Sequence, residues 1–116
     1  MPLLGFVEAN DPRWLATLAA IDRELGDGPL VRRWADDPNG FLLCSYWFAE
    51  CEALAGRVDD AQRRFEALAG FANDLGLMTE MVVPDTGEAI GNLPQAFSHV
   101  GLINAARRIT AATPRR

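Results

Sequence analysis

The chain of 116 residues is long enough for one domain and too short for several. Hydrophobic residues make up 49% of the sequence, which is enough for a core and argues against an intrinsically disordered chain. The formal net charge of -5 predicts no partnership with nucleic acid, because a phosphate-binding surface needs clustered Lys and Arg.

Neither end of the sequence indicates a special partner. The start, MPLLGFVEANDPRW, lacks the basic residues, long apolar stretch and small-residue cleavage site of a secretion signal. No apolar run reaches the ~20 residues that a membrane span needs, so we expect a cytoplasmic protein with no membrane partner. We expect the basic residues near the C-terminus to lie at an exposed helix end, where the helix dipole favours cations. They are Arg107, Arg108, Arg115 and Arg116.

The cysteines, Cys44 and Cys51, are predicted to lie on one helix. Two helical turns separate them by ~10 Å of rise, which is too far for a disulfide. With no Cys/His cluster to suggest zinc, the sequence predicts buried thiols in a reducing compartment, with no metal and no cofactor.

The first predicted helix follows Asp11, a good N-cap, and Pro12, which suits the first helical position. Its apolar positions step by four, three and four residues: Trp14, Leu18, Ile21 and Leu25. Gly26 and Gly28 are expected to end it. Residues 29–40 are predicted to form a loop or a short extended piece, because Pro, Asp, Asn and Gly dominate their second half.

The next two helices are predicted to form an antiparallel hairpin. Residues 41–56, FLLCSYWFAECEALAG, are apolar on most sides and should be buried between neighbours. Residues 58–76 carry one apolar stripe and are expected to end at Gly76. The stripe consists of Ala61, Phe65, Leu68, Ala72 and Leu75. Only a few residues separate the two helices, which favours the hairpin.

A fourth helix is predicted from Pro94 to about Ala112, and nearly every side of its AFSHVGLINAA segment is apolar or small. The preceding VVPDTGEAIGN alternates weakly around a PDTG turn and could form a short hairpin. Other strand signals are scarce, so the predicted fold class is all-α, with antiparallel helical hairpins.

Four segments in order resemble the C-terminal part of the catalytic domain of glycoside hydrolase family 15. They are GPLVRRW, GFLLCSYWFAECEALAGRVDDAQRRFEAL, ANDLGLMTEMV and DTGEAIGNLPQAFSHVGLINAA. The resemblance runs from about Pro2 to Ile109, and GNLPQAFSHVGLINAA is its most specific part. The family contains glucoamylases, dextran glucosidases and bacterial trehalases.

The resemblance implies a fold and a chemistry. The family fold is an (α/α)6 toroid of helical hairpins, of which residues 1–116 would supply about the last third as one segment. The family's enzymes cleave α-glucosidic bonds with inversion, using a carboxylic acid and a carboxylate. The apolar fourth helix would belong to the inner ring. The implied partner is an α-glucoside or a trehalose-type sugar.

The resemblance also implies roles for individual residues. Glu80 in MTEMV takes the position of the general base, although an isolated Glu is more often a solvated loop residue. Arg33 in VRRW matches an arginine that hydrogen-bonds sugar hydroxyls, or it packs its stem on Trp34 as a surface arginine. Trp34 and Phe97 could offer flat faces to a sugar, whereas Trp47 is expected in the core.

Two further residues have simpler interpretations, and the sequence departs from the family at other positions. His99 is expected to be a hydrogen-bonded structural histidine, because the inverting mechanism does not require one. Glu88 is expected to be exposed in a turn. Met81 and Val83 stand where the family usually has acidic residues, and DDPNG replaces a loop that often carries Gly and Glu.

The family's general acid comes from a segment upstream of the region that this chain resembles. We therefore expect the isolated chain to have little or no activity, because a positioned acid contributes about 10²–10⁴-fold to the rate. The alternative is a non-catalytic helical module derived from the fold. Exposed apolar faces would then favour association, either as a homo-oligomer or with a complementary upstream segment.

Overall fold

The computed structural model describes residues 1–114 and contains four α-helices. They are α1 (Pro12–Leu25), α2 (Leu42–Leu54), α3 (Val58–Ala69) and α4 (Ala96–Ala112), preceded by the 3-10 helix η1 (Pro2–Leu4). None of the helices in residues 1–114 is long and apolar enough to cross a lipid bilayer. Arg115 and Arg116, expected at an exposed helix end, lie outside the described residues.

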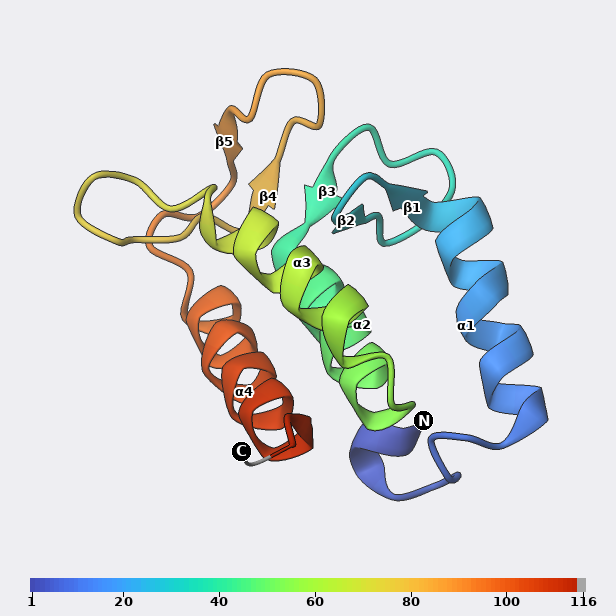
Figure 1. Cartoon of the computed structure of the whole chain (residues 1–116). Coiled ribbons are helices and arrows are strands. Elements are labelled where there is room, and N and C mark those ends of the chain that lie inside the picture. The colour runs from blue at the N-terminus through green and yellow to red at the C-terminus, as the bar shows by residue number, and fades with distance from the viewer. Residues whose placement is uncertain (115–116) are drawn as a thin grey trace.

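Helix α2 lies at the centre of the structure and packs against both α3 and α4 (Figure 1). The connection between α2 and α3 is short, and the two helices form the predicted antiparallel hairpin. Helices α2 and α4 both begin at the end of the molecule that carries the strands, and they run in the same direction (Figure 1).

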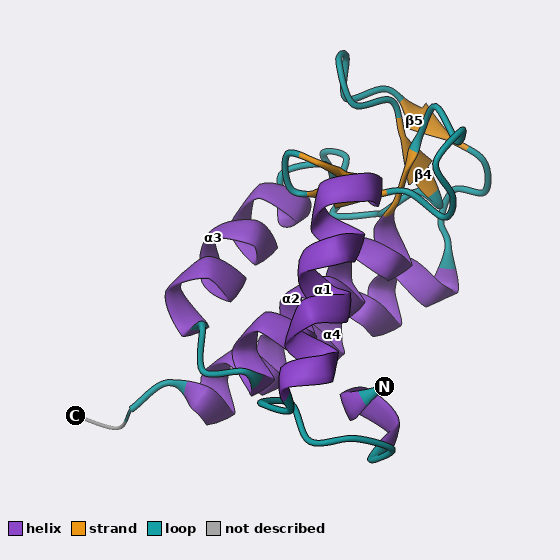
Figure 2. Ribbon diagram, turned by 90° about the vertical axis from the view of Figure 1, so that its right-hand side faces the viewer, coloured by secondary structure: helices purple, strands orange, loops and turns teal. Residues whose placement is uncertain are grey.

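The prediction of an all-α fold is only partly correct, because two small antiparallel sheets lie at one end of the helices (Figure 2). One pairs β1 (Gly26–Asp27) with β2 (Leu30–Val31). The other has the order β3 (Gly40–Phe41), β4 (Met81–Val82) and β5 (Ala89–Ile90). The β4–β5 pair is the hairpin expected from VVPDTGEAIGN. Every strand has only two residues, too few to show an alternating pattern in the sequence, and the β4–β5 pair was expected from its turn.

The main core joins α2, α3 and α4 to the strands. Its fully buried members come from distant parts of the chain: Leu30, Leu42, Tyr46, Ala49, Leu68, Met78, Val82 and Ala105. Helix α4 approaches α2 closely at Gly101, where an added Cβ would lie 3.0 Å from the Cβ of Tyr46. The absence of a side chain at Gly101 therefore sets the separation of these two helices.

The boundaries of the first helix agree with the prediction, and those of the third do not. The side chain of Asp11 accepts a hydrogen bond from the Arg13 N–H and caps α1. Helix α3 ends at Ala69 rather than near Gly76. The Asn73 side chain accepts hydrogen bonds from the N–H groups of Leu75 and Leu77, which stabilises a turn in place of further helix.

Several apolar side chains expected in the interior are exposed in the described chain. Leu75 has an exposed fraction of 76%, because α3 ends before it, and Trp47 has 38%. Helix α4 begins at Ala96, two residues after the predicted start, and exposes Phe97, Val100 and Ile103. These three residues recur every third position and form an apolar stripe along the helix.

Candidate functional site

Glu80 is half-buried where the chain enters β4, at the end of the molecule that carries the strands. Its backbone N–H donates to the Asn92 carbonyl at 2.9 Å, and its own carbonyl accepts from the Leu42 N–H at 3.2 Å. The carboxylate oxygen Oε2 accepts from the Asn92 N–H at 3.1 Å. Both the backbone and one carboxylate oxygen of Glu80 are therefore held in place.

Gly91 makes room for the Glu80 carboxylate. A Cβ at position 91 would stand 2.6 Å from Oε2, and the backbone of Gly91 has a φ of +81°. Both conditions require glycine, because a left-handed backbone and close approach are unfavourable for other residues. The GN pair before Leu93 thus supplies the space and the N–H that position the acid.

The first turn of α4 anchors the segment immediately before Glu80. The hydroxyl of Ser98 donates to the Thr79 carbonyl at 2.7 Å, in a buried position. The ring of His99 bridges Gln95 and Met78: Nδ1 lies 2.6 Å from the Gln95 carbonyl, and Nε2 accepts from the Met78 N–H at 3.2 Å. Both nitrogens of His99 are engaged, which confirms its interpretation as a structural histidine.

Arg33 lies between β2 and β3 and is held by a buried acid. Its Nε donates to Oδ2 of Asp37 at 2.9 Å, and Asp37 is 3% exposed. The guanidinium carbon lies 4.4 Å from the ring centroid of Trp34 and 5.1 Å from that of Phe41. The ion pair and the two rings fix the guanidinium while its side chain stays 31% exposed.

The second sheet brings Arg33 close to the strand that follows Glu80. Nη2 of Arg33 lies 3.1 Å from Sδ of Met81, and Met81 pairs with Phe41 across β3 and β4. The thioether of Met81 thus contacts the arginine directly. Arg33 therefore contacts the residue that follows Glu80, although no hydrogen bond or ion pair joins Arg33 to Glu80 among the described residues.

The aromatic candidates Trp34 and Phe97 are both exposed. Trp34 is 53% exposed beside Arg33, and Phe97 is 61% exposed in the first turn of α4. Phe97 neighbours Ser98, which contacts the segment before Glu80. The structure thus places both rings on segments that adjoin the strand end, and their outer faces are accessible.

Other acids that could serve as a proton donor are engaged elsewhere or exposed. Glu50 pairs with Arg108 at 3.3 Å, and Glu52 pairs with Arg64 at 3.0 Å. Glu88 is exposed in the β4–β5 turn, as expected. No group of three His, Cys, Asp or Glu side chains within residues 1–114 is placed to hold a metal ion.

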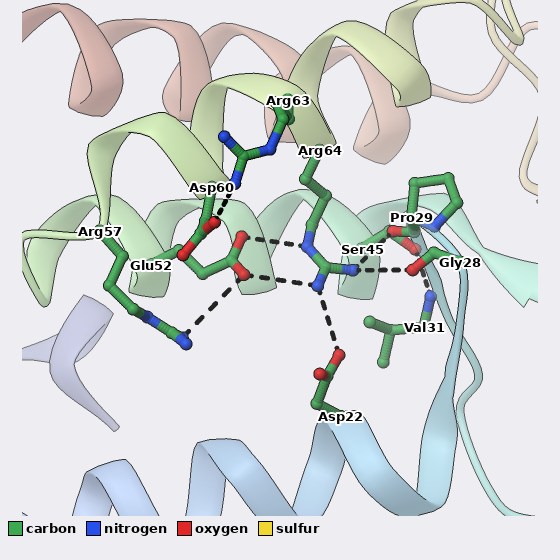
Figure 3. A network of polar contacts seen from close by, with 10 residues as sticks. All are labelled: Asp22, Gly28, Pro29, Val31, Ser45, Glu52, Arg57, Asp60, Arg63 and Arg64. Carbon is green, nitrogen blue, oxygen red and sulfur yellow. Dashed lines mark hydrogen bonds and ion pairs between the residues drawn. The ribbon is translucent and has the colours of Figure 1, made fainter.

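The Glu52–Arg64 pair belongs to a network that fixes the β1–β2 turn (Figure 3). Arg64 donates to both carboxylate oxygens of Glu52, to Asp22, and to the carbonyls of Gly28 and Pro29. Its guanidinium also lies 4.3 Å from the Phe48 ring centroid. One arginine of α3 thereby connects α1, α2 and the turn that leads toward Arg33.

Sequence reasoning missed Asp37, Gly91 and Asn92 as parts of this site. The available signal was local: DDPNG and IGN are turn sequences, in which Asp, Asn and Gly satisfy backbone groups. The Arg33–Asp37 pair spans four residues of an irregular loop, where the spacing alone indicates no contact. The Asn92–Glu80 contact spans twelve residues and depends on the tertiary fold.

The chain is similar to known proteins over nearly its whole length. Residues 1–107 match the family model described as glycosyl hydrolases family 15. A trehalase of Thermoplasma acidophilum is 38% identical, with the match covering 97% of this chain and 20% of that protein. A trehalase of Mycolicibacterium smegmatis is 37% identical over 95% of this chain and 18% of its own length.

A relative from a third genus shows the same pattern. Trehalase 2 of Sulfolobus acidocaldarius is 36% identical over 89% of this chain and 19% of its own length. The chain thus spans about one fifth of the length of the relatives it matches. No solved structure matches it. The match over residues 1–107 and the likeness to the trehalases establish that the chain belongs to glycosyl hydrolases family 15.

Proposed function

We propose that this chain forms part of an inverting α-glucosidase of the glucoamylase or trehalase type, with Glu80 as the general base. The observation that carries the proposal is the fixed carboxylate of Glu80, in which Oε2 is bound by the Asn92 N–H. The other oxygen, Oε1, has no partner among the described contacts and is available to a water molecule.

An inverting base must deprotonate water on the face of the sugar opposite the leaving group. The acid and the base then stand about 6.5–9.5 Å apart, which leaves room for that water. Glu80 would take the water's proton at Oε1 while Asn92 holds Oε2. The hydroxide equivalent attacks the anomeric carbon, and the departing sugar oxygen receives a proton from the acid.

The structure suggests how sugar hydroxyls would be bound. Nη1 of Arg33 has no partner among the described contacts, and Asp37 fixes the orientation of the guanidinium. A guanidinium fork with a fixed Nε can donate to two hydroxyls in a defined direction. Trp34 and Phe97 would supply apolar faces. The names of the relatives favour trehalose among α-glucosides.

We propose that the general acid lies outside these 116 residues. Glu50 and Glu52 are engaged in ion pairs with Arg108 and Arg64, and both are nearly buried. The helices would then form part of an (α/α)6 toroid, with α2 and α4 in the same ring because they run in the same direction (Figure 1). The location would be cytoplasmic.

The test is glucose release from trehalose and maltose by the purified chain, compared with Glu80→Gln. Gln can still accept the Asn92 N–H, so this variant removes the base and retains the local contact. We expect no release from either protein, because proton donation to the leaving oxygen is missing. Turnover that disappears in Glu80→Gln would contradict an external acid, and it would place one within the chain or its assembly.

A second candidate function is a non-catalytic interaction module. The observation that favours it is the apolar stripe of α4, in which Phe97, Val100 and Ile103 are 61%, 52% and 55% exposed. Such a surface favours association with a second copy or with a complementary segment. Analytical ultracentrifugation at high protein concentration tests self-association, which a monomeric mass would contradict. If the parent chain is oligomeric, an equal oligomeric mass for Val100→Glu would exclude this stripe as the interface.

A further inference from the structure

A polar pocket is lined by residues of α2, α4 and η1. Figure 1 shows η1 beside the ends of α2 and α4 that lie opposite the strands. Its volume is about 430 Å³. The side chains that matter for recognition come from the middle and the second half of each helix. They are Trp47 and Glu50 from α2 and Asn104, Arg107 and Arg108 from α4. This pocket is separate from Glu80, which lies at the strand end.

Glu50 lines the pocket with a buried carboxylate. The residue is only 4% exposed, and its Oε2 accepts from Nε of Arg108 at 3.3 Å. Burial raises the pKa of Glu50, and the hydrogen bond and charge of Arg108 oppose that effect. Oε1 of Glu50 has no partner among the contacts described for residues 1–114. Glu50 therefore offers a free acceptor beside the Arg108 guanidinium.

The remaining side chains complete a surface for a hydroxylated ligand. Asn104 offers both a donor and an acceptor through its amide. Trp47 is 38% exposed and offers an aromatic face. Small-molecule sites commonly combine an aromatic surface with a few polar groups that fix orientation. A sugar ring carries both hydroxyl groups and an apolar face, so it can contact the polar side chains and the aromatic side chain together.

We propose that this pocket is a second carbohydrate site, which binds a neutral mono- or disaccharide. The Glu50–Arg108 pair is neutral overall and can both accept from and donate to hydroxyl groups. Arg107 adds a second guanidinium to the lining, so an anion is the main competing ligand. This inference goes beyond the proposed catalysis and does not depend on Glu80 being a base.

The test is a titration of the chain with trehalose and with maltose, followed by ¹H–¹⁵N correlation NMR. We expect the backbone amides of Asn104 and Arg107 to shift with saturation. Trp47→Ala and Asn104→Ala should each weaken the fitted Kd by at least about tenfold. Asn104→Ala breaks no ion pair, so it keeps the test interpretable if Trp47→Ala alters the fold.

Two controls and three contrary results define the test. Trp34→Ala and Glu80→Gln, both at the strand end, should leave the shifts at Asn104 unchanged. Sugar-induced shifts confined to the strand end would overturn this inference and leave the proposed function standing. Saturable shifts with inorganic phosphate, and none with either sugar, would identify an anion site instead. Shifts with neither probe would also overturn the proposal.

Discussion

Asp37 binds Arg33 through a buried ion pair, with Oδ2 accepting from Nε at 2.9 Å, and it also accepts from the Asn39 N–H through Oδ1 at 3.1 Å. One carboxylate therefore orients the arginine proposed to bind sugar and closes the turn before β3. Asp37 is buried, whereas Arg33 keeps part of its side chain in solvent.

Asp37→Ala should lower the free energy of unfolding by about 1–3 kcal/mol, because it leaves a backbone N–H and a guanidinium without their acceptor. Asp37→Asn should cost less, because its amide oxygen can replace one of the two acceptors. Urea denaturation of both variants measures the difference. Equal stability of Asp37→Ala and the parent chain would show that the pair is not stabilising.

Removing Arg64 should destabilise the fold far more than removing its neighbour Arg63. Arg64 is 11% exposed and pairs with Glu52, which is 6% exposed (Figure 3). Arg64→Met would leave this buried carboxylate with only the Arg57 guanidinium, 4.0 Å away. We expect a loss of about 3 kcal/mol or more from Arg64→Met. Arg63 pairs with Asp60 on the surface, and Arg63→Met should cost less than about 1 kcal/mol.

Comparing Arg64→Met with Arg63→Met separates the effect of burial on stability from the effect of losing one positive charge. Each substitution removes one positive charge from α3 and keeps a flexible side chain of similar length. Urea denaturation under identical salt conditions would give both values. Similar losses for the two variants would contradict the assignment of Arg64 as the residue that connects α1, α2 and the β1–β2 turn.

Gly91→Ala should displace the Glu80 carboxylate. The φ values of Gly91 and Gly76 are +81° and +76°, so alanine strains the backbone similarly at both. An added Cβ meets nothing within 4 Å at Gly76, but it would lie 2.6 Å from Oε2 at Gly91. Gly76→Ala should cost about 1–2 kcal/mol, and Gly91→Ala should cost more.

A spectroscopic measurement shows whether the extra cost comes from Glu80. The amide resonance of Asn92 should move in Gly91→Ala, because its acceptor is Oε2 of Glu80. That resonance should stay in place in Gly76→Ala. If Gly91→Ala and Gly76→Ala have the same stability and the same Asn92 resonance, Gly91 does not make room for the acid.

Cys44 should react with iodoacetamide before Cys51 in the folded chain. Burial raises the pKa of Cys51 to about 12, with further contributions from the charges of Glu50 and Glu52. Burial also raises the pKa of Cys44, but this residue is only partly buried, and Arg33 opposes the shift. The thiolate is the reactive form, so Cys51 should be modified last.

Mass spectrometry of partly alkylated protein would assign the order of modification. Alkylation in concentrated urea is the control, since both thiols should then react at comparable rates. Faster modification of Cys51 in native buffer would contradict its burial against Val31 and Phe48.

The raised pKa of Glu50 predicts a pH dependence of stability. Burial is its main cause, and the contacts of Arg108 oppose it. A carboxyl group with a higher pKa in the folded state binds more protons when folded, so its contribution to stability falls as the pH rises. The melting temperature of the parent chain minus that of Glu50→Gln should therefore decrease between about pH 4 and pH 7.

Two melting series, one for each protein at matched ionic strength, measure this slope. The difference between the two proteins cancels the titration of the groups that both retain. A difference that grows with pH would mean that the Arg108 ion pair outweighs burial, opposite to the direction assigned here.

The sequence predicted the elements that are long enough to show a pattern. Helix α1 combines a capping Asp11, a Pro12 and an apolar stripe, and its bounds were predicted closely. Helix α3 was predicted too long, because the capping turn at Asn73 outweighs the continuing apolar pattern. Strands of two residues carry no period, so only the β4–β5 hairpin was expected, from its turn.

The candidate site was predicted through its resemblance to a family, and its supporting contacts were not. Glu80 and Arg33 stand within short motifs that could be compared position by position. Asn92 contacts Glu80 only when β4 and β5 pair. Asp37 pairs with Arg33 four residues away, within a turn sequence that has no periodic pattern to indicate the contact. Trp47 was misplaced in the core, because an apolar helix does not show which side its neighbours leave open.

The central claim is that Glu80 is the base of an inverting hydrolysis, and a substrate that needs no proton donor tests it most directly. α-Glucosyl fluoride suits the purpose, because fluoride leaves without protonation by a general acid. Hydrolysis by the chain would be followed by NMR of the first-formed anomer, beside Glu80→Gln and the hairpin control Glu88→Gln. We predict slow formation of β-glucose that is lost in Glu80→Gln and retained in Glu88→Gln. Formation of α-glucose, or a rate that is the same in all three proteins, would contradict the role of Glu80.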